Sequence, residues 1–214
     1  IIAFLVFGIH IVGDKQMCAK STAVDKISAA VEASDALFFL THNYTGYPLI
    51  RQARTLIAQG GIGDVRVVQA EYAQGWLAQE IEAKGQKQAS WRTDPEKSGA
   101  GGAIGDIGTH AFNLLEFVSG LEVSALSADL QSFGKGRMLD DNAHILLKLG
   151  PSARGMIWAS QIAVGAENGL KLRIYGSKGS LEWSQENPNQ LTYSQLDAPT
   201  QILTRGGVGL PVAA

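Results

Sequence analysis

The order of apolar segments changes character near residues 60–64, and this change constrains the fold more than any other feature. Before it, short apolar runs at residues 9–12 and 36–40 alternate with segments of helical spacing at residues 20–33 and 47–59. Strand, helix, strand and helix in this order predict an open parallel sheet. We therefore expect a first α/β unit that ends close to residue 62.

After residue 63 the chain reads as a series of strands joined by short turns. The strand-like runs lie at residues 65–72, 123–130, 143–149, 154–162, 170–175, 180–183 and 191–196. Turn residues such as Gly150-Pro151 and Glu167-Asn168-Gly169 separate several of them. Because antiparallel strands can be joined by short turns, we expect a mixed, largely antiparallel open sheet over residues 63–214. The predicted fold class is α/β, with an α+β C-terminal part whose helices cover one face of the sheet.

Composition excludes several classes of function. The 214 residues are 45% hydrophobic and 18% charged, which is typical of a soluble globular protein. A net charge of −2 favours neither a nucleic-acid nor a membrane partner. The single cysteine, Cys18, excludes an internal disulfide framework and fits a reducing compartment, so we expect a cytoplasmic protein.

The two ends of the chain carry an expectation about its extent. The apolar run at residues 1–13 is too short for a membrane span and has no basic segment before it, as a signal peptide would. A buried helix end followed by a buried strand explains the run better. We expect the sequence to be the interior of a longer protein whose C-terminal end is also incomplete.

The stretch at residues 91–120 is the most informative for function. A polar loop passes through five glycines between Gly99 and Gly108 and then becomes an amphipathic helix. Asp106 and His110 are four residues apart, so on a helix they share one face. A second line of side chains has the spacing of a buried stripe: Ile104, Ile107, Ala111, Leu114, Leu115 and Val118. This pattern predicts a helix that packs on one side and presents an acid and an imidazole on the other.

The glycines of this stretch are not a dinucleotide fingerprint. Their spacing does not match G-x-G-x-x-G, and they follow a charged loop rather than a strand. We expect them to allow a close backbone approach to a ligand, or a tight turn into the helix. No zinc motif is present, and the pair Asp140-Asp141 is interpreted as a turn, so we predict no metal. Polar residues at 13–16 and 41–44 follow the first two strands, where open parallel sheets bind ligands.

Taken in order, these segments resemble the Gfo/Idh/MocA family of oxidoreductases. The resemblance is carried by Asp14-Lys15-Gln16, by Asn43, by Trp91-Arg92 and the glycine loop leading to Asp106 and His110, and by LRIYGSKGSLEW at residues 172–183. It implies an NAD- or NADP-dependent dehydrogenase of a sugar or an inositol-like polyol. Residues 1–62 would be the C-terminal part of a Rossmann domain without its glycine fingerprint. Residues 63–214 would bind substrate and form a homo-oligomer, a dimer or tetramer, through the sheet.

The resemblance also implies roles for individual residues. Lys15 would lie near the nicotinamide and the reacting hydroxyl, and His110 would be the general base. Asp106 would hydrogen-bond the sugar or orient the imidazole. Asp14, Lys15 and Asn43 would contact the cofactor, while Arg92, Asp106 and Asn43 would contact the substrate. Gln16 stands where the family has a proline. Without its nucleotide-binding half, the chain is expected to be inactive alone.

Each of these residues also has a structural interpretation. His110 could be a packing histidine, Asp106 a helix N-terminal acid, Lys15 a solvated lysine and Asn43 a turn residue. We interpret Trp91 and Trp183 as packing residues and His42 and His144 as structural. Two other functions remain open for the same fold: a non-catalytic, sugar-responsive binding or regulatory protein, and an oligomerisation module.

Overall fold

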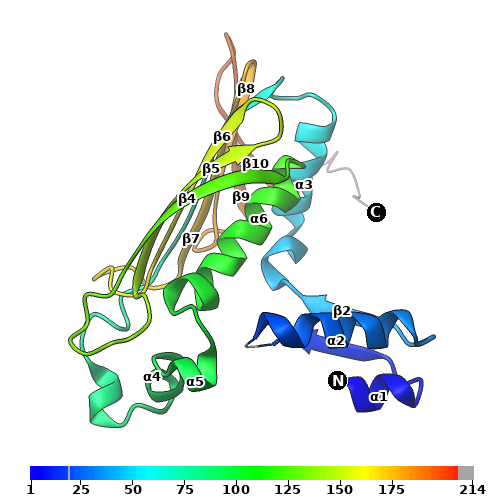
Figure 1. Ribbon diagram of the computed structural model, residues 1–214. Helices are drawn as coiled ribbons and strands as arrows, with labels where there is room; N and C mark the ends of the chain where they lie inside the picture. Colours follow the sequence, from blue (N-terminus) through cyan, green and yellow to red (C-terminus); the bar gives the residue numbers. More distant parts are fainter. Residues whose placement is uncertain (19, 207–214) are drawn as a thin grey trace.

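The computed structural model describes residues 1–18 and 20–206, and its first unit is a small parallel sheet. Strand β1 (Ile11–Asp14) pairs in parallel with β2 (Phe38–Thr41), and α2 (Ser21–Glu32) connects them (Figure 1). Helix α1 (Ile2–Val6) packs against α2. The predicted strand–helix–strand order and parallel pairing are confirmed, which brings the carboxyl ends of both strands to the same edge of the sheet.

The second unit is an eight-stranded sheet with the order β10-β9-β8-β7-β3-β6-β5-β4. Its strands are β3 (Val65–Ala73), β4 (Val123–Gln131), β5 (Asn142–Leu149), β6 (Ala153–Ser160), β7 (Gly169–Gly176), β8 (Gly179–Ser184), β9 (Gln190–Gln195) and β10 (Gln201–Thr204). Among the described strands of this sheet, β3 and β6 alone pair in parallel, so the predicted largely antiparallel open sheet is confirmed. The sequence had predicted every strand except β10.

Two helices cover one face of this sheet. Helix α3 (Pro48–Ala58) packs against α6 (Thr109–Ser119), and α6 lies on β3, β6 and β7 (Figure 1). The predicted stripe is buried, with Ile107, Ala111, Leu114, Leu115 and Val118 at most 4% exposed. Each large apolar side chain buried in this way contributes roughly 1.5–3 kcal/mol. The packed stripe fixes the rotation of α6 and thereby the direction in which His110 points.

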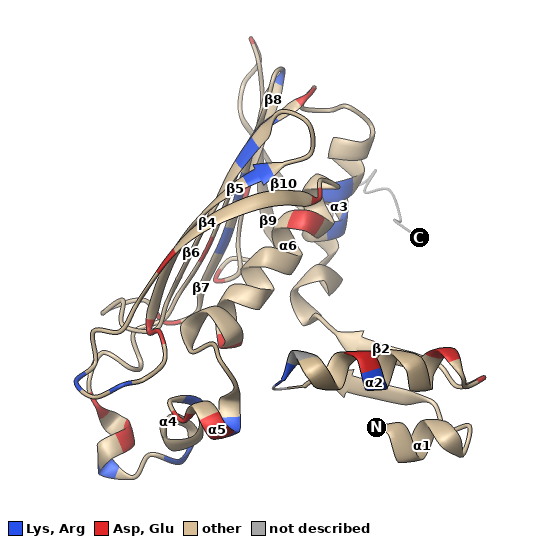
Figure 2. Ribbon diagram, in the orientation of Figure 1, with Lys and Arg blue, Asp and Glu red and all other residues tan. Residues whose placement is uncertain are grey.

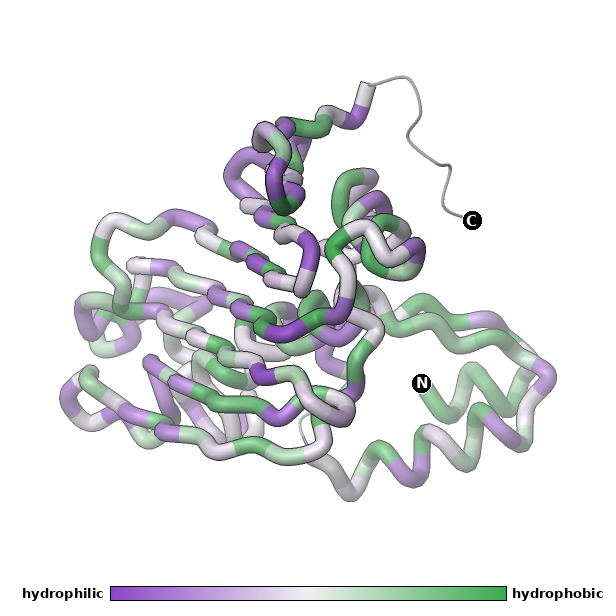
Figure 3. The backbone as a smooth tube through the Cα atoms, turned by 90° about the horizontal axis from the view of Figure 1, so that it is seen from above, coloured by the Kyte–Doolittle hydropathy of each residue, from purple (hydrophilic) through white to green (hydrophobic). Residues whose placement is uncertain are grey.

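The other face of the sheet carries no helix among the described residues in Figure 1. Alternate residues of β5, such as His144, Leu146 and Lys148, are exposed there, because successive side chains of a strand point to opposite faces. Figure 2 shows that basic and acidic residues are interspersed over both units, and Figure 3 shows that apolar residues dominate α1. Within the described residues, no helix has both the length and the apolar character needed to cross a membrane.

The polar composition of residues 73–90 predicts an irregular segment, but residues 73–98 contain three short helical elements. These are η2 (Ile81–Lys84), α4 (Lys87–Arg92) and α5 (Pro95–Ser98). The prediction was wrong for η2 and most of α4, and local capping contributes to these short helices. The Gln86 side chain accepts a hydrogen bond from the Ala89 amide, and Asp94 accepts one from the Glu96 amide. Pro95 occupies the first turn of α5, a position that favours helix initiation.

Candidate functional site

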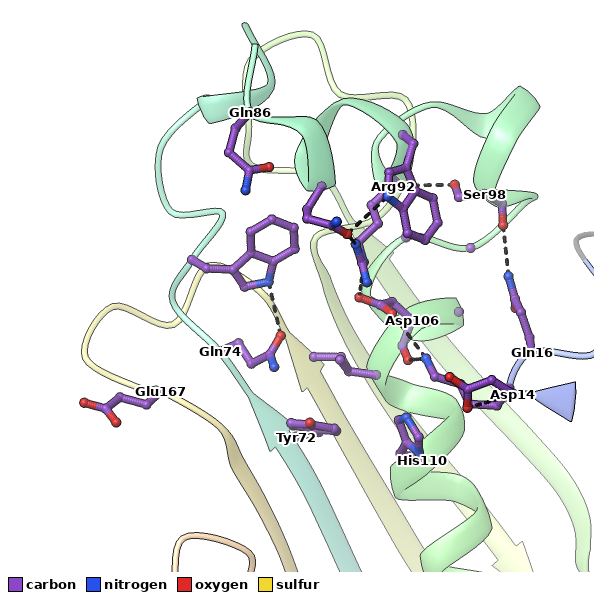
Figure 4. A pocket seen from close by; sticks show the side chains of 18 residues that line it. Asp14, Gln16, Tyr72, Gln74, Gln86, Arg92, Ser98, Asp106, His110 and Glu167 are labelled. Carbon is purple, nitrogen blue, oxygen red and sulfur yellow. Dashed lines mark hydrogen bonds and ion pairs between the residues drawn. The ribbon is translucent and has the colours of Figure 1, made fainter. Parts of the chain in front are cut away.

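A cavity of about 750 Å³ lies where the two units meet, within the size range of small-molecule sites. It is bordered by the segment after β1, by the end of β3, by α4 and by the start of α6 (Figure 4). The residues that line it include Asp14, Lys15, Gln16, Tyr72, Gln74, Trp76, Gln86, Gln88, Trp91, Arg92, Asp106, His110 and Glu167. The cavity therefore combines indole rings, amides and charged groups, which suits a polar small molecule.

The carboxylate of Asp106 joins the two units. It accepts hydrogen bonds from Lys15 Nζ at 3.2 Å and Arg92 Nε at 3.0 Å. Gln161 Nε2 donates to it at 2.9 Å. Lys15 Nζ also donates to the Asp106 backbone carbonyl. The structure thus brings together Lys15, Arg92 and Asp106, although they lie 14 to 91 residues apart in the sequence.

Hydrogen bonds to the Asp140 carboxylate hold the turn that carries Asp106. Residues Ile104–Gly108 form a single π-helical turn, η3, ahead of α6. The Asp140 carboxylate accepts hydrogen bonds from the amides of Gly102 and Ile104, both at 2.7 Å. A side chain on Gly102 would overlap the carbonyl oxygen of Asp140. This glycine therefore allows a close approach to the protein's own backbone, and Asp140 is an anchor for the site rather than only a turn residue.

His110 lies on the floor of the cavity and is 9% exposed. Its ring centroid is 4.9 Å from that of Tyr44, 6.1 Å from that of Tyr72 and 6.1 Å from that of His42. Burial, followed by the positive charge of Lys15, lowers the pKa of His110 to about 4. The imidazole is therefore neutral near pH 7. The hydrogen bonds of the Asp106 carboxylate in the described residues come from Lys15, Arg92 and Gln161, not from His110.

The residues after β1 border the cavity at the edge of the parallel sheet. The Asp14 carboxylate accepts hydrogen bonds from Thr41 Oγ1 at 2.8 Å and from the Lys15 amide at 2.9 Å. The Thr41 hydroxyl, then the Lys15 amide, holds the Asp14 pKa below its usual value. Gln16 Nε2 donates to the Ser98 carbonyl at 3.1 Å, and the Lys15–Gln16 peptide bond is cis. Asn43 begins η1 (Asn43–Gly46), where it is exposed and outside the cavity lining.

Most residues of the cavity wall were not predicted from the sequence. Trp183 is 1% exposed in the core, as interpreted, but Trp91 is 37% exposed and lines the cavity. The Arg92 guanidinium carbon lies 4.2 Å from the centroid of a Trp91 ring. The interpretation of Trp91 as a packing residue was therefore wrong. The available signal was the recurrence of Gln and Trp across residues 74–91, including Gln74, Trp76, Gln86 and Gln88.

His42, interpreted as structural, lies beside this site. Its ring contacts the edge of His110, and its Nδ1 is buried without a hydrogen-bond partner in the described part of the chain. Burial, then the Lys15 charge, lowers its pKa, so His42 is also neutral near pH 7. His144 lies on the open sheet face, where its ring stacks on Trp158.

Comparison with known proteins gives consistent matches. The family model of the GFO/IDH/MocA C-terminal domain matches residues 50–182. An uncharacterized oxidoreductase, YfiI of Bacillus subtilis, is 35% identical over 206 residues, which is 95% of this chain and 52% of that protein. The chain spans about half the length of the curated relatives it matches.

Solved structures match over nearly the whole chain. An oxidoreductase from Sinorhizobium meliloti is 48% identical with a TM-score of 0.86, covering 99% of this chain and 55% of that one. An inositol dehydrogenase homolog from Azotobacter vinelandii, solved with NAD+, is 36% identical with a TM-score of 0.92, covering 97% and 54%. An inositol dehydrogenase homolog from Azotobacter vinelandii, solved with NADH and myo-inositol, is 34% identical with a TM-score of 0.87, covering 97% of this chain and 53% of that one.

Proposed function

Because the chain belongs to the GFO/IDH/MocA family of oxidoreductases, we propose that the protein transfers hydride between NAD or NADP and a carbon that bears a hydroxyl in a sugar or cyclic polyol. The observation that carries the proposal is the grouping of Lys15, Arg92 and Asp106 beside the buried, neutral His110 in one cavity. The similarity to an inositol dehydrogenase homolog that binds NADH and myo-inositol supports the substrate class.

The two units would divide the work. We assign residues 1–62 to the nucleotide-binding domain and residues 63–214 to the substrate-binding and oligomerisation domain. The parallel pair β1 and β2 supports the first assignment, because open parallel sheets bind ligands at the carboxyl ends of their strands. Those ends place Asp14 and Lys15 at the cavity, which fits a nicotinamide, and Asn43 would extend the same edge. A nicotinamide bound there would accept the hydride from the carbinol carbon.

His110 would remove the proton of the reacting hydroxyl. Its lowered pKa keeps an imidazole nitrogen unprotonated near neutral pH and able to accept that proton. The Lys15 ammonium would stabilise the negative charge that develops on the hydroxyl oxygen as its proton leaves. Asp106 and Arg92 would hydrogen-bond the substrate, and Asp106 also holds Lys15 in place at 3.2 Å.

Replacement of His110 tests this function. In the complete natural polypeptide that carries residues 1–214, His110→Asn should lower kcat by about 10²–10⁴-fold, the range for a lost general base. Nicotinamide reduction, followed by absorbance with a panel of inositols and aldoses and with each cofactor, measures the effect. His10→Asn, which is exposed and outside the residues that line the cavity, is the matched control. If the wild type reduces neither cofactor with any compound in the panel, the chain is better explained as a sugar-responsive binding protein or an oligomerisation module.

The open face of the eight-stranded sheet would join copies of the protein in a dimer or tetramer. Leu146, Met156 and Tyr175 on β5, β6 and β7 are 62%, 42% and 41% exposed on this face, and apolar surface of this kind favours association. Sedimentation equilibrium of the wild type and of Leu146→Glu measures the assembly state. A wild type that sediments as a monomer would contradict the assignment.

A further inference from the structure

Five side chains form one continuous hydrogen-bond chain along the wall of the cavity. The Tyr44 and Tyr72 hydroxyls lie 2.5 Å apart, and the Tyr72 hydroxyl lies 2.6 Å from Asn168 Oδ1. Gln74 Nε2 approaches the same Asn168 oxygen at 3.0 Å, and Trp76 Nε1 lies 3.1 Å from Gln74 Oε1. Figure 4 shows Tyr72 and Gln74 on β3 and the segment after it, with the indole bonded to Gln74. This hydrogen-bond chain thus runs from Tyr44, which packs against His110, to the indole of Trp76 at the cavity wall.

The chemistry of the indole fixes the direction of every bond in this chain. An indole N–H can only donate, so Gln74 must turn its carbonyl oxygen toward Trp76 and its amide nitrogen toward Asn168. Asn168 must then receive that donor with Oδ1. Because a carbonyl oxygen only accepts, the Tyr72 hydroxyl must donate to Asn168, and the Tyr44 hydroxyl must donate to Tyr72.

These directions determine what the wall can offer a ligand. Both tyrosine hydroxyl hydrogens are used within the chain, so neither is available to His110, although both rings pack against the imidazole. Gln74 uses its oxygen and one N–H, which leaves the second N–H of Nε2 for the cavity. Trp76 uses its only N–H, which leaves its ring surface. The wall therefore presents a hydrogen-bond donor beside an apolar face, a pattern complementary to a hydroxylated ring.

Within this hydrogen-bond chain, Asn168 links the two tyrosines to Gln74 and Trp76, but it does not line the cavity. It immediately precedes β7, the antiparallel neighbour of β3, and Tyr72 is paired with Leu170 in that register. The Asn168 amide donates to Glu186 Oε1 at 3.2 Å, which ties its backbone to the turn after β8. Its carboxamide contacts Tyr72 and Gln74 through Oδ1, and Nδ2 donates to the Tyr44 hydroxyl at 3.5 Å. Of these three side chains, Tyr72 and Gln74 line the cavity, so Asn168 acts on a ligand indirectly.

We propose that Asn168 is a positioning residue for substrate recognition. Its Oδ1 orients Gln74 so that Gln74 donates a hydrogen bond to a substrate hydroxyl while Trp76 packs against the ring of the substrate. This inference rests on the proposed function, because it takes the ligand of the cavity to be a sugar or cyclic polyol.

A pair of substitutions at Asn168 tests the inference. Asn168→Asp keeps an acceptor oxygen for both Tyr72 and Gln74, whereas Asn168→Leu has a similar size and no acceptor. In the complete natural polypeptide, Asn168→Leu should raise the KM for the polyol about tenfold or more, with kcat changed by less than about threefold. Asn168→Asp should restore the KM to within about threefold of the wild type. Asn187→Leu, in the turn after β8, is the matched control.

The pH dependence of kcat distinguishes a positioning role of Asn168 from a change in the pKa of His110. The pH dependence of kcat should stay the same in Asn168→Leu, because this change adds no charge near His110 and, within the described residues, the Asn168 side chain bonds to Tyr44, Tyr72 and Gln74. Should Asn168→Leu fail to fold, Gln74→Met and Gln74→Glu take its place. Both lack the N–H that faces the cavity and should raise the KM, while kcat stays within about threefold.

Three results would count against the inference. Equal KM values in the Leu and Asp variants of Asn168, or an unchanged KM in Gln74→Met, would overturn it while leaving the proposed function intact. A wild type that oxidises no sugar or polyol with either cofactor would remove the proposed function, and this inference with it.

Discussion

The two units of the protein cover their apolar residues to different degrees. In the eight-stranded unit, Leu114, Leu115 and Ile157 are at most 2% exposed and belong to one continuous core. In the two-stranded unit, Val12 of β1 and Phe39 of β2 are 72% and 54% exposed. Because burial of apolar area is the main stabilising contribution, the large unit has a core of its own, whereas the small sheet leaves much of its apolar surface uncovered.

The units also contribute unequally to the cavity. The large unit supplies His110, Asp106 and Arg92, while the small unit supplies Lys15. Outside residues 42–62, which lead from the small sheet to β3 and pack against the large unit, the hydrogen bonds between the units in the described chain come from Lys15 and Gln16. The alignment of the site therefore depends on a few polar contacts, whereas the stability of the molecule depends on the core of the larger unit. Substitutions in the two regions should consequently have different effects.

The largest expected difference is in stability. Leu114→Ala opens a cavity in the core of the large unit and should lower the free energy of unfolding by about 2–5 kcal/mol. Phe39→Ala removes a side chain that is 54% exposed and should cost less than about 1.5 kcal/mol. Chemical denaturation of the 214-residue chain, followed by circular dichroism, measures both. Equal losses in the two variants would show that the units do not differ in this way.

The next prediction concerns pH and the effect of the Lys15 charge, in the small unit, on His110 in the large unit. The pKa of His110 is about 4 in the folded protein, against an ordinary value of 6.5 for an exposed histidine, so the unfolded chain binds more protons between these values. Stability should therefore fall as the pH drops from about 6.5 to about 4, by about 3 kcal/mol in total. Because burial and then the Lys15 charge lower this pKa, Lys15→Met should raise it. Titration of the His110 ring by NMR checks the shift, and an unchanged pKa would exclude coupling between the units.

A third prediction concerns the ion pairs of Asp106 with Lys15 and Arg92. Asp106→Asn removes the charge that holds both Lys15 and Arg92, while it keeps an oxygen and the shape of the side chain. We expect kcat/KM to fall about 10²-fold, equivalent to about 2.7 kcal/mol, with little change in the free energy of unfolding. Steady-state kinetics and denaturation separate the two quantities. Asp129→Asn on β4, remote from the cavity, is the control, and a similar loss of activity in that variant would contradict a local role.

The fold was largely predictable because its signals are local and repeated. The buried stripe of α6 has helical spacing, and turn residues separate the strands, so pattern alone identified most elements. The central position of β3 was not predictable. This strand comes first in its unit but lies between β6 and β7, and that order depends on contacts between residues about 90 to 110 apart in the sequence. Strand β10 (QILT) was missed because only two of its residues are apolar and it is mostly exposed, whereas the apolar run ALFFL at residues 36–40 predicted β2.

The site was predictable in its acid and imidazole but not in its walls. Asp106 and His110 share one helix face, which spacing reveals, and the family resemblance added Lys15 and Arg92. The hydrogen bonds of Asp106 to Lys15 and Arg92, and the hydrogen-bond chain through Asn168, join residues from different elements. No local pattern encodes them. Asp140 shows the same limit, since a pair of acids before a strand has the pattern of a turn until the glycine loop is seen bound to it.

The smallest expected effect tests whether the polar contacts between the units act separately. Gln16→Leu removes the hydrogen bond from Gln16 Nε2 to the Ser98 carbonyl but leaves the ion pair of Lys15 with Asp106 in place. A partly exposed hydrogen bond of this kind contributes about 0.5–1.5 kcal/mol, so kcat/KM should fall by about two- to tenfold. The effect on Lys15 is indirect, so the pH dependence of activity should not move. A loss as large as that of Asp106→Asn would mean that Gln16 and Lys15 hold the units together as one cooperative contact, whereas a small loss would identify the Lys15–Asp106 ion pair as the principal link.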